Sequence, residues 1–303
     1  TDDTPAMLTT GKGITVINNE NNLGFIKNCN NAAKFAHGKY ILFLNNDTYV
    51  TKGCLKALLE TAEKEGKVAI VGPNLISADG RLLENGWIMG IDGWGHPIGR
   101  DKDATHYEYN YLKEVDCVTG TCLLVRKDVF VKVGLFNETF SPAFYDEFDL
   151  AFSVRQMGYK VMVQPKAEVV HYGSISYGGG ERDRLSAINR QKFLERWRVV
   201  LQERLKQPHD YFLVRDRSQG KKVILLIDDT VPDYDKYAGS LTMYQYTKLF
   251  QDMGFKVIFL PDNLEKLEPY TSEMQQQGIE VIYGEFDSRS WIRDNGRYID
   301  IVW

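Results

Sequence analysis

The sequence GKYILFLNNDT, residues 38–48, contains the pattern from which the fold class follows. Its apolar residues, Tyr40 to Leu44, form a continuous run without polar alternation, which is typical of a strand buried on both faces. The polar residues Asn45, Asn46 and Asp47 follow directly. Gly38 is suited to end a preceding helix. The stretch therefore predicts the end of a helix, a buried strand and a polar turn, in that order.

Strand and helix patterns alternate on both sides of this stretch. The β-branched run 14–17 predicts a strand and residues 21–37 predict a helix. Downstream, leucines and alanine at helical spacing over 55–62 predict a helix, and 68–71 predicts another strand. This alternation favours a mostly parallel α/β sheet. Residues 74–114, rich in Gly, Asp, Tyr and Trp, predict irregular structure with short strands.

Further strands are predicted at 122–125, 161–163 and 168–170. Asp128 is expected to cap a short helix. Leu150, Val154 and Met157 mark one face of a helix that ends at Gly158. A long amphipathic helix is predicted over residues 183–205. These elements complete a first domain, for which we expect residues 1–206.

A polar segment, residues 207–221, contains Pro208 and Gly220 and is predicted to be a linker. After it the alternation restarts, with strands at 223–227, 257–260, 280–283 and 299–303 and a helix at 241–253. Residues 222–303 therefore predict the opening of a second doubly wound domain. The first residues are unlike a signal peptide or a natural start, and the last resemble a strand with nothing after it, so we expect a fragment truncated at both ends.

Composition and charge narrow the functional classes. The chain has 303 residues, 43% of them hydrophobic and 26% charged, as in ordinary globular proteins. A net charge of −4 argues against nucleic acid as the main partner. No apolar run approaches the roughly 20 residues of a membrane span, although peripheral association with a membrane stays open. The 4 cysteines form no C-x-x-C pair and indicate reduced thiols in a cytoplasmic protein.

Three polar segments follow apolar runs and suggest one chemistry. Asp47 comes at a strand end, where α/β sheets place ligand sites, and a carboxylate there suits a divalent cation on a diphosphate. A polar turn after a buried strand is the alternative interpretation. His171 follows Val169 and Val170, and its imidazole could bind Mn²⁺, although a histidine packed in the core is the commoner case.

The second segment is acidic. Asp146, Glu147 and Asp149 open a predicted helix, and one of two adjacent carboxylates could serve as a general base with a raised pKa. Ordinary first-turn acids of a helix are an equally good interpretation. Beyond His171, residues 172–180 are rich in glycine and could form a lid over a donor, or an ordinary surface loop.

As an ordered set, these segments resemble inverting GT-A glycosyltransferases of the family-two type, including rhamnosyltransferase-like members, over residues 1 to about 205. The segments that carry the resemblance are Asn22-Leu23-Gly24-Phe25 with Asn30, residues 38–48, residues 118–126, Gly134-Leu135-Phe136-Asn137-Glu138, Asp146-Glu147-Phe148-Asp149-Leu150, and Val170-His171. The tail from Lys221 resembles the start of a GT-B glycosyltransferase of the family-four type, through 226–229, Pro232, Gly239-Ser240 and 254–257.

The resemblance implies a nucleotide-diphospho-sugar transferase fold without its first strand, followed by a partial second Rossmann-like domain. It implies that Asp47 and His171 hold Mg²⁺ or Mn²⁺ and that Glu147, with Asp146 beside it, is the base. Donor and acceptor binding would fall to Gly24, Asn30, Asn45, Asn46, Gly120 and Asp149. The implied partners are a UDP- or dTDP-sugar and a glycan acceptor, perhaps lipid-linked, at the inner face of the plasma membrane.

Two departures from the family pattern leave a rival open. The metal motif carries one carboxylate, and the acidic pair reads Asp146-Glu147 in inverted order, so either residue could be the base. The region that would cradle the nucleotide base is also missing. The rival hypothesis is a non-catalytic glycan- or nucleotide-binding module of a larger glycosyltransferase, and a third places the activity in the tail domain.

Overall fold

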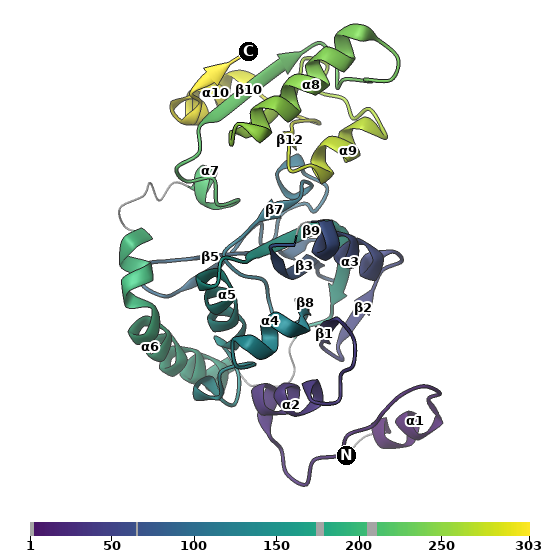
Figure 1. Cartoon of the computed structure of the whole chain (residues 1–303), viewed down its shortest axis with the longest axis vertical. Helices are drawn as coiled ribbons and strands as arrows, with labels where there is room; N and C mark the ends of the chain where they lie inside the picture. The colour runs from purple at the N-terminus through teal and green to yellow at the C-terminus, as the bar shows by residue number, and fades with distance from the viewer. Residues whose placement is uncertain (1–2, 65, 174–178, 205–210) are drawn as a thin grey trace.

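The structure, a computed structural model, describes residues 3–64, 66–173, 179–204 and 211–303. Within these ranges a mixed sheet of 7 strands and a parallel sheet of 4 strands form the centres of two units. The units stack along the long axis of the molecule, with the parallel sheet at the C-terminal end (Figure 1). The chain is thus an α/β protein with two separate sheets, as predicted.

The mixed sheet has the central order β1-β8-β3-β9-β2, with β4 on β3 and β7 on β9. A hairpin of β5 and β6 lies beside it. The strands of this unit are β1 (Tyr40–Leu44), β2 (Thr48–Val50), β3 (Val68–Ile76), β4 (Leu82–Glu84), β5 (Trp87–Met89), β6 (Gly95–Pro97), β7 (Lys113–Glu114), β8 (Cys122–Arg126) and β9 (Lys160–His171).

Strand direction differs from the prediction of a mostly parallel sheet, which is wrong for this unit. Among the strand pairs of the described residues, β3–β9 is parallel and the others of this sheet are antiparallel. The reason is that residues 77–121, between β3 and β8, contain hairpins and turns and no α-helical crossover, so the chain can return antiparallel. Because β8 is antiparallel to both β1 and β3, the strands β1, β3 and β9 point the same way.

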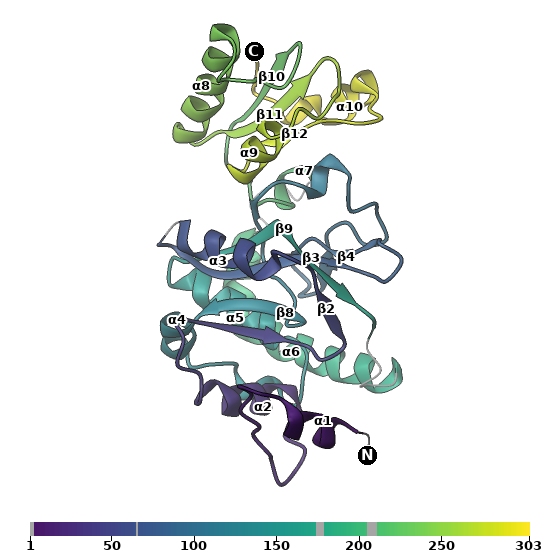
Figure 2. The ribbon, with the colours of Figure 1, turned by 90° about the vertical axis from the view of Figure 1, so that its right-hand side faces the viewer.

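Helices cover both faces of the mixed sheet. Successive apolar side chains of β1 point to opposite faces, and both sets pack against helices. Ile41 and Phe43 pack into one cluster with α2, α4, α5 and α6, whereas Tyr40 and Leu42 pack into another with α3. Figure 2 shows α3 on one side of the strands and α6 on the other. The helices of this unit are α1 (Thr4–Thr10), α2 (Gly24–Ala33), α3 (Cys54–Lys64), α4 (Lys127–Lys132), α5 (Asp146–Gln156) and α6 (Gly179–Arg204), with 3-10 turns η1 (Tyr107–Tyr109) and η2 (Glu138–Phe140).

Several local predictions need correction. The run 14–17 is not a strand: Ile14 and Val16 are exposed, and β propensity without a partner strand among the described residues does not build one. The helix α2 ends at Ala33, short of the predicted residue 37. Asp128 lies in the first turn of α4 and pairs with Arg126, which occupies the N-cap position. The two strands predicted at 161–163 and 168–170 form the single strand β9.

The C-terminal unit has the parallel sheet that the restarted alternation predicts. Its strand order is β12-β11-β10-β13, and helices α8 and α9 pack on one face. Its elements are α7 (Tyr211–Val214), β10 (Val223–Asp228), α8 (Ala238–Asp252), β11 (Lys256–Pro261), α9 (Tyr270–Gln276), β12 (Glu280–Val281), α10 (Ser288–Asn295), η3 (Gly296–Tyr298) and β13 (Ile301–Val302). The domain boundaries themselves remain a prediction.

The two units share buried side chains. Tyr107 of η1 packs with Phe212, Ile258 and Leu260 on the second face of the parallel sheet. The described part of the predicted linker, 211–221, begins with α7, and Phe212, Leu213 and Val214 are buried. This segment is therefore part of the packed junction between the units.

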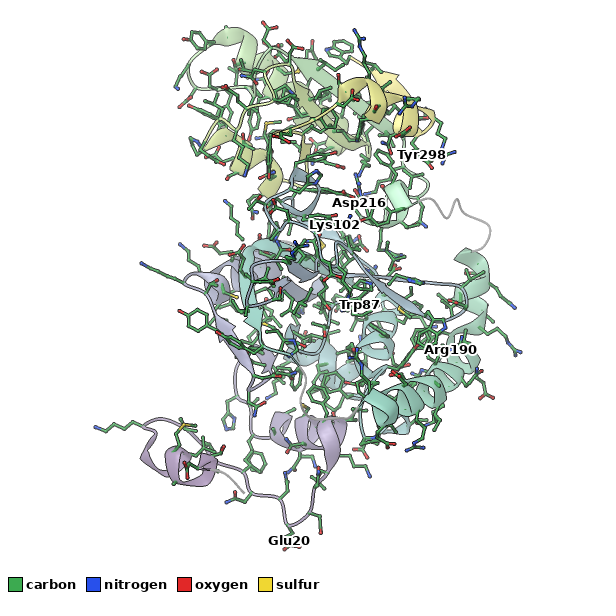
Figure 3. All side chains as sticks on the ribbon, turned by 180° about the vertical axis from the view of Figure 1, so that it is seen from behind. Glu20, Trp87, Lys102, Arg190, Asp216 and Tyr298 are labelled. Carbon is green, nitrogen blue, oxygen red and sulfur yellow. The ribbon has the colours of Figure 1, made fainter. Side chains whose placement is uncertain are left out.

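A buried network of charges crosses the same junction. Arg215 binds Glu108 of the first unit at 2.5 Å and Glu280 of β12 at 2.6 Å, and Lys256 binds Glu280 at 3.1 Å. Asp216, labelled between the units in Figure 3, pairs with Lys256 and accepts a 2.8 Å hydrogen bond from Tyr111. Burial alone would raise the pKa of Asp216, but Lys256 and Arg215 hold it well below its usual range. Asp216 is therefore ionised and paired at neutral pH.

None of the helices in the described ranges is long and apolar enough to cross a membrane.

This network yields a prediction about stability. Replacing Glu280 by Gln leaves Arg215 and Lys256 buried without their shared carboxylate, which should lower the free energy of unfolding by about 3–5 kcal/mol. Urea denaturation followed by circular dichroism measures this. The matched control is Glu63→Gln, which breaks the exposed pair with Lys39 and should change the free energy of unfolding far less, because water and salt screen that pair. Equal effects of both changes would contradict a stabilising network.

Candidate active site

The C-terminal ends of β1 and β9 bring Asp47 and His171 together. Thr48 of β2 pairs with His171 of β9, which places the turn 45–47 beside the end of β9. The Asp47 Oδ2 atom lies 3.1 Å from His171 Nε2, and the backbone N–H of Tyr172 donates to the Asp47 carbonyl. The His171 side chain is 12% exposed and that of Asp47 31%. The two residues expected to share a cation are thus in direct contact at a surface that a ligand can reach.

The turn before β8 lies at the same edge. The backbone N–H of Asn45 donates to the Thr121 carbonyl at 2.9 Å, and the Thr48 hydroxyl donates to the Asn45 carbonyl at 2.6 Å. Gly120, next to Thr121, lies under Phe25 of α2, so that a Cβ atom there would meet the ring at 3.4 Å. Asn46 is exposed. Asn45, Asn46 and Gly120 therefore surround the edge that Asp47 and His171 occupy.

The acidic pair sits at the first turn of α5. Asp146 is 2% exposed, and its Oδ2 atom has no hydrogen-bond partner among the described residues. Burial, and then the neighbouring Glu147, raise the pKa of Asp146 well above its usual value. Burial raises the pKa of Glu147 to about 7, with a further contribution from the charge of Glu84. At neutral pH Asp146 is therefore protonated while Glu147 can ionise, which favours Glu147 as the proton acceptor.

Glu84, which the sequence analysis missed, is a third buried carboxylate in this region. It ends β4, is 4% exposed, accepts the indole N–H of Trp87 and accepts the backbone N–H of Thr119 at 3.1 Å. Burial raises its pKa to about 7. The available signal was weak: one acid directly after Leu82 and Leu83, within a stretch read as irregular.

Three other predicted ligand-binding residues have structural partners. The Asn30 side chain donates to and accepts from the backbone of Phe136, at 2.8 and 3.0 Å. Asp149 is 3% exposed and binds Trp197 Nε1 at 2.7 Å and Arg196 at 2.9 Å. These contacts hold α2 and α6 in place.

The structure also explains why residue 24 is a glycine. Its φ of +71° is unfavourable for other residues, and a Cβ atom there would lie 2.6 Å from the Pro142 Cβ atom. Any role of Gly24, Asn30 or Asp149 toward a ligand stays a prediction. The predicted glycine-rich lid falls largely on residues 174–178, which lie outside the described ranges.

The donor set at the edge fits a cation shared with a substrate. Asp47 offers a carboxylate and His171 an imidazole, and the described residues contain no group of 3 or more His, Cys, Asp and Glu side chains placed to hold a metal alone. Mg²⁺ and Mn²⁺ in phosphate-transfer sites are commonly bound by one or two protein ligands, with phosphate and water completing the shell. The pair is therefore compatible with Mg²⁺ or Mn²⁺ bound together with a diphosphate.

Comparison with known proteins finds relatives over about the first half of the chain. Residues 1–134 match the family model described as Glycosyl transferase family 2. Over 155 residues, 49% of this chain, the sequence is 30% identical to the uncharacterized protein y4gI of Sinorhizobium fredii. It is 30% identical over 154 residues, 48% of this chain, to the O-antigen biosynthesis protein RfbC of Myxococcus xanthus. It is also 26% identical over 166 residues, 51% of this chain, to the N-acetylglucosaminyl-diphospho-decaprenol L-rhamnosyltransferase of Mycobacterium tuberculosis.

The chain spans only part of each of these relatives: 17% of the Sinorhizobium protein, 12% of the Myxococcus protein and 54% of the mycobacterial enzyme. The family match includes Asp47, Glu84 and Gly120, whereas the acidic pair and His171 follow it in the chain. The first half of the chain is therefore similar to the Glycosyl transferase family 2 model and to an O-antigen biosynthesis protein and a rhamnosyltransferase.

Proposed function

We propose that this chain transfers a sugar from a nucleotide-diphosphate donor, a UDP- or dTDP-sugar, to a hydroxyl of a glycan acceptor with inversion at the anomeric carbon. The observation that supports the proposal is a pair of chemical groups in the first unit that are linked through Glu84 and the turn before β8. Asp47 and His171 form one group, and Glu147 with its raised pKa forms the other. Contacts through Glu84, Thr119, Thr121 and Asn45 connect them.

In the proposed reaction, the acceptor hydroxyl oxygen bonds to the anomeric carbon while the bond from that carbon to the diphosphate oxygen breaks. Glu147 accepts the hydroxyl proton, and the nucleoside diphosphate leaves with the electron pair of the broken bond. Asp146, kept neutral by burial, leaves the negative charge of the pair on Glu147. Asp47 and His171 would hold Mg²⁺ or Mn²⁺, which supplies charge neutralisation at the departing diphosphate.

The relatives suggest where this reaction belongs. One is named as an O-antigen biosynthesis protein and another as a rhamnosyltransferase whose named substrate contains a decaprenyl diphosphate. We extend this to the present chain by proposing cell-surface polysaccharide synthesis on a glycan acceptor, with a lipid-linked glycan as one candidate. Peripheral association with the inner face of the plasma membrane would bring the site to such an acceptor.

A second candidate function concerns the C-terminal unit. A cavity of about 780 Å³ lies where β10 ends and α8 begins, and Asp228, Asp229, Tyr237 and Ser240 are among its lining residues. The carboxylates of this cavity can accept hydrogen bonds from the hydroxyl groups of a sugar, and they repel phosphate. The Tyr237 side chain is 67% exposed and can stack on a sugar ring. The cavity supports glycan binding by this unit, with or without catalysis in the first unit.

The proposed base gives the first test. Glu147→Gln removes the proton acceptor at nearly constant size, so kcat/KM should fall by about 10²- to 10⁴-fold. In the unmodified protein, activity should rise as the pH increases through about 7, because burial raises the pKa of Glu147 to that value and the base must be ionised. A radiolabelled-sugar transfer assay between pH 5 and 9 measures both. Glu138→Gln, an exposed acid, is the control, and an unchanged rate in Glu147→Gln would exclude the assigned base.

The donor site gives the second test. Thermal shift with UDP, dTDP or GDP, each with and without Mn²⁺, should show stabilisation of roughly 2–6 °C for one nucleotide with metal at concentrations well above Kd. Asp47→Ala should abolish the shift, whereas Asp79→Ala, at an exposed turn, should preserve it. A shift that survives Asp47→Ala, or no shift with any pair, would argue against a working donor site in this chain.

The cavity in the C-terminal unit gives the third test. Saturation-transfer-difference NMR with neutral oligosaccharides should detect binding that Tyr237→Ala weakens at least about tenfold, because the exposed ring supplies stacking area. Met253→Ala, exposed just past the far end of α8, should leave binding unchanged. Equal binding by both variants would remove this second candidate.

A further inference from the structure

Glu84 is a buried carboxylate that accepts hydrogen bonds from Trp87 and from the turn before β8, and the mechanism above assigns it no role. Its position follows from the sheet: β4 pairs with the end of β3, and Glu84 lies opposite Leu75, which itself lies beside Val169 of β9. The residue therefore comes to the edge where β1 and β9 end. It lies within the first unit and is separate from the charge network at the junction.

One oxygen of Glu84 holds the turn before β8. Glu84 Oε1 accepts the Thr119 N–H at 3.1 Å, and the Thr119 and Thr121 hydroxyls lie 3.3 Å apart. The Thr121 carbonyl in turn accepts the Asn45 N–H at 2.9 Å. A movement of Glu84 would therefore be transmitted to the turn that carries Asp47.

The other oxygen holds the helix that carries the acidic pair. Glu84 Oε2 accepts the indole N–H of Trp87, labelled in Figure 3, and the Trp87 ring packs against Phe148 with centroids 5.5 Å apart. Phe148 directly follows Glu147 in α5. Gly95 of β6 allows the two rings to pack this closely, because a Cβ atom at Gly95 would lie 2.9 Å from both rings.

The two partners of Glu84 are both donors, which restricts the residue type. A carboxylate offers acceptors on both oxygens, whereas a glutamine would turn an NH₂ group toward one of the two N–H groups. Burying a negative charge is unfavourable, and the two hydrogen bonds offset only part of that penalty, since the pKa of Glu84 stays raised, to about 7. A charge kept at this position therefore has an effect beyond holding two segments.

We propose that Glu84 is a positioning residue for the proposed transfer, which fixes the Thr119–Thr121 turn and the first turn of α5 and directs its negative charge at Glu147. A carboxylate near Glu147 disfavours its ionisation and makes the ionised form a stronger proton acceptor. The inference rests on the proposed function for its kinetic consequence, but not for the electrostatic coupling between the two glutamates.

The groups that act on these two carboxylates are few and can be named. The charge of Arg100 lowers the pKa of Glu84, and the charge of Glu84 raises the pKa of the Cys122 thiol. Glu147 is affected by Glu84 and by Asp146, and it acts on Tyr145. Removing the Glu84 charge should therefore lower the pKa of Glu147. Weakening the hydrogen bonds that stabilise this charge should act in the same direction, because Glu84 would then be protonated more of the time.

The test compares Glu84→Gln with Trp87→Phe and Glu84→Asp. In Glu84→Gln, the acid limb of the kcat/KM profile should shift to lower pH by about 0.5–1 unit, and kcat above pH 8 should fall about 3- to 10-fold because the base is weaker. Trp87→Phe keeps an aromatic ring and the carboxylate but removes one donor to Glu84, which raises the pKa of Glu84 and weakens its charge, so the limb should stay or move to lower pH. Glu84→Asp retains the charge and should keep the limb within about 0.3 unit.

A second readout works without activity. Titration of the Glu147 carboxyl carbon by ¹³C NMR, assigned by its loss in Glu147→Gln, should show a midpoint near pH 7 that falls in Glu84→Gln. If no donor is turned over but the NMR midpoint moves, the proposed function fails and the coupling stands. If Glu84→Gln lowers activity and leaves both the limb and the midpoint unchanged, Glu84 is only structural and the proposal is wrong. If Glu84→Gln does not fold, the proposal is overturned when Trp87→Phe moves the limb to higher pH.

Discussion

The pairing of β8 with both β1 and β3 is the constraint on which the candidate active site depends. Backbone hydrogen bonds in these two antiparallel pairs, together with the parallel pair β3–β9, send β1, β3 and β9 in one direction. Their C-terminal ends and the start of β8 then share one edge of the sheet. Asp47, Thr121 and His171 meet there because each lies at, or one to three residues beyond, a strand end. The cores on the two sheet faces maintain this register, since a one-residue slip would move Ile41 and Phe43 to the wrong face.

The acidic region shows how burial assigns chemical roles to similar groups. Asp146 and Glu84 are buried and Glu147 is partly buried, and burial raises the pKa of each. They differ in their partners. Glu84 receives two N–H donors, Asp146 has an unpaired buried oxygen, and Glu147 is affected by the charge of Glu84 and by a hydrogen bond with Asp146. Such an arrangement separates a neutral carboxylic acid from an ionisable neighbour, as general-base catalysis near neutral pH requires.

The junction between the units carries a different kind of constraint. Arg215, Lys256, Asp216 and Glu280 form a buried network, and Tyr107 of the first unit contributes to the core of the second. The relative placement of the two units is therefore set by side-chain packing as well as by the connecting chain. This has a functional meaning if both units bind sugars, because a fixed junction would hold the cavity near α8 at a constant distance from the first unit.

The sequence by itself determined the α/β class, the strand β1, the helices α3, α5 and α6 and the restart of alternation near residue 222. It also singled out Asp47, Glu147 and His171, whose chemical roles stay predictions. These follow from local periodicity and from polar residues at strand ends, which are short-range properties. Only the tertiary structure decided strand direction, the exposure of 14–17, the internal roles of Asn30 and Asp149, and the position of Glu84. Each of these depends on contacts between residues far apart in the chain: Glu84 meets Thr119 across 35 positions, and Asn30 meets Phe136 across 106. Local patterns carry no information about such partners, because burial and hydrogen bonding are settled when the elements pack.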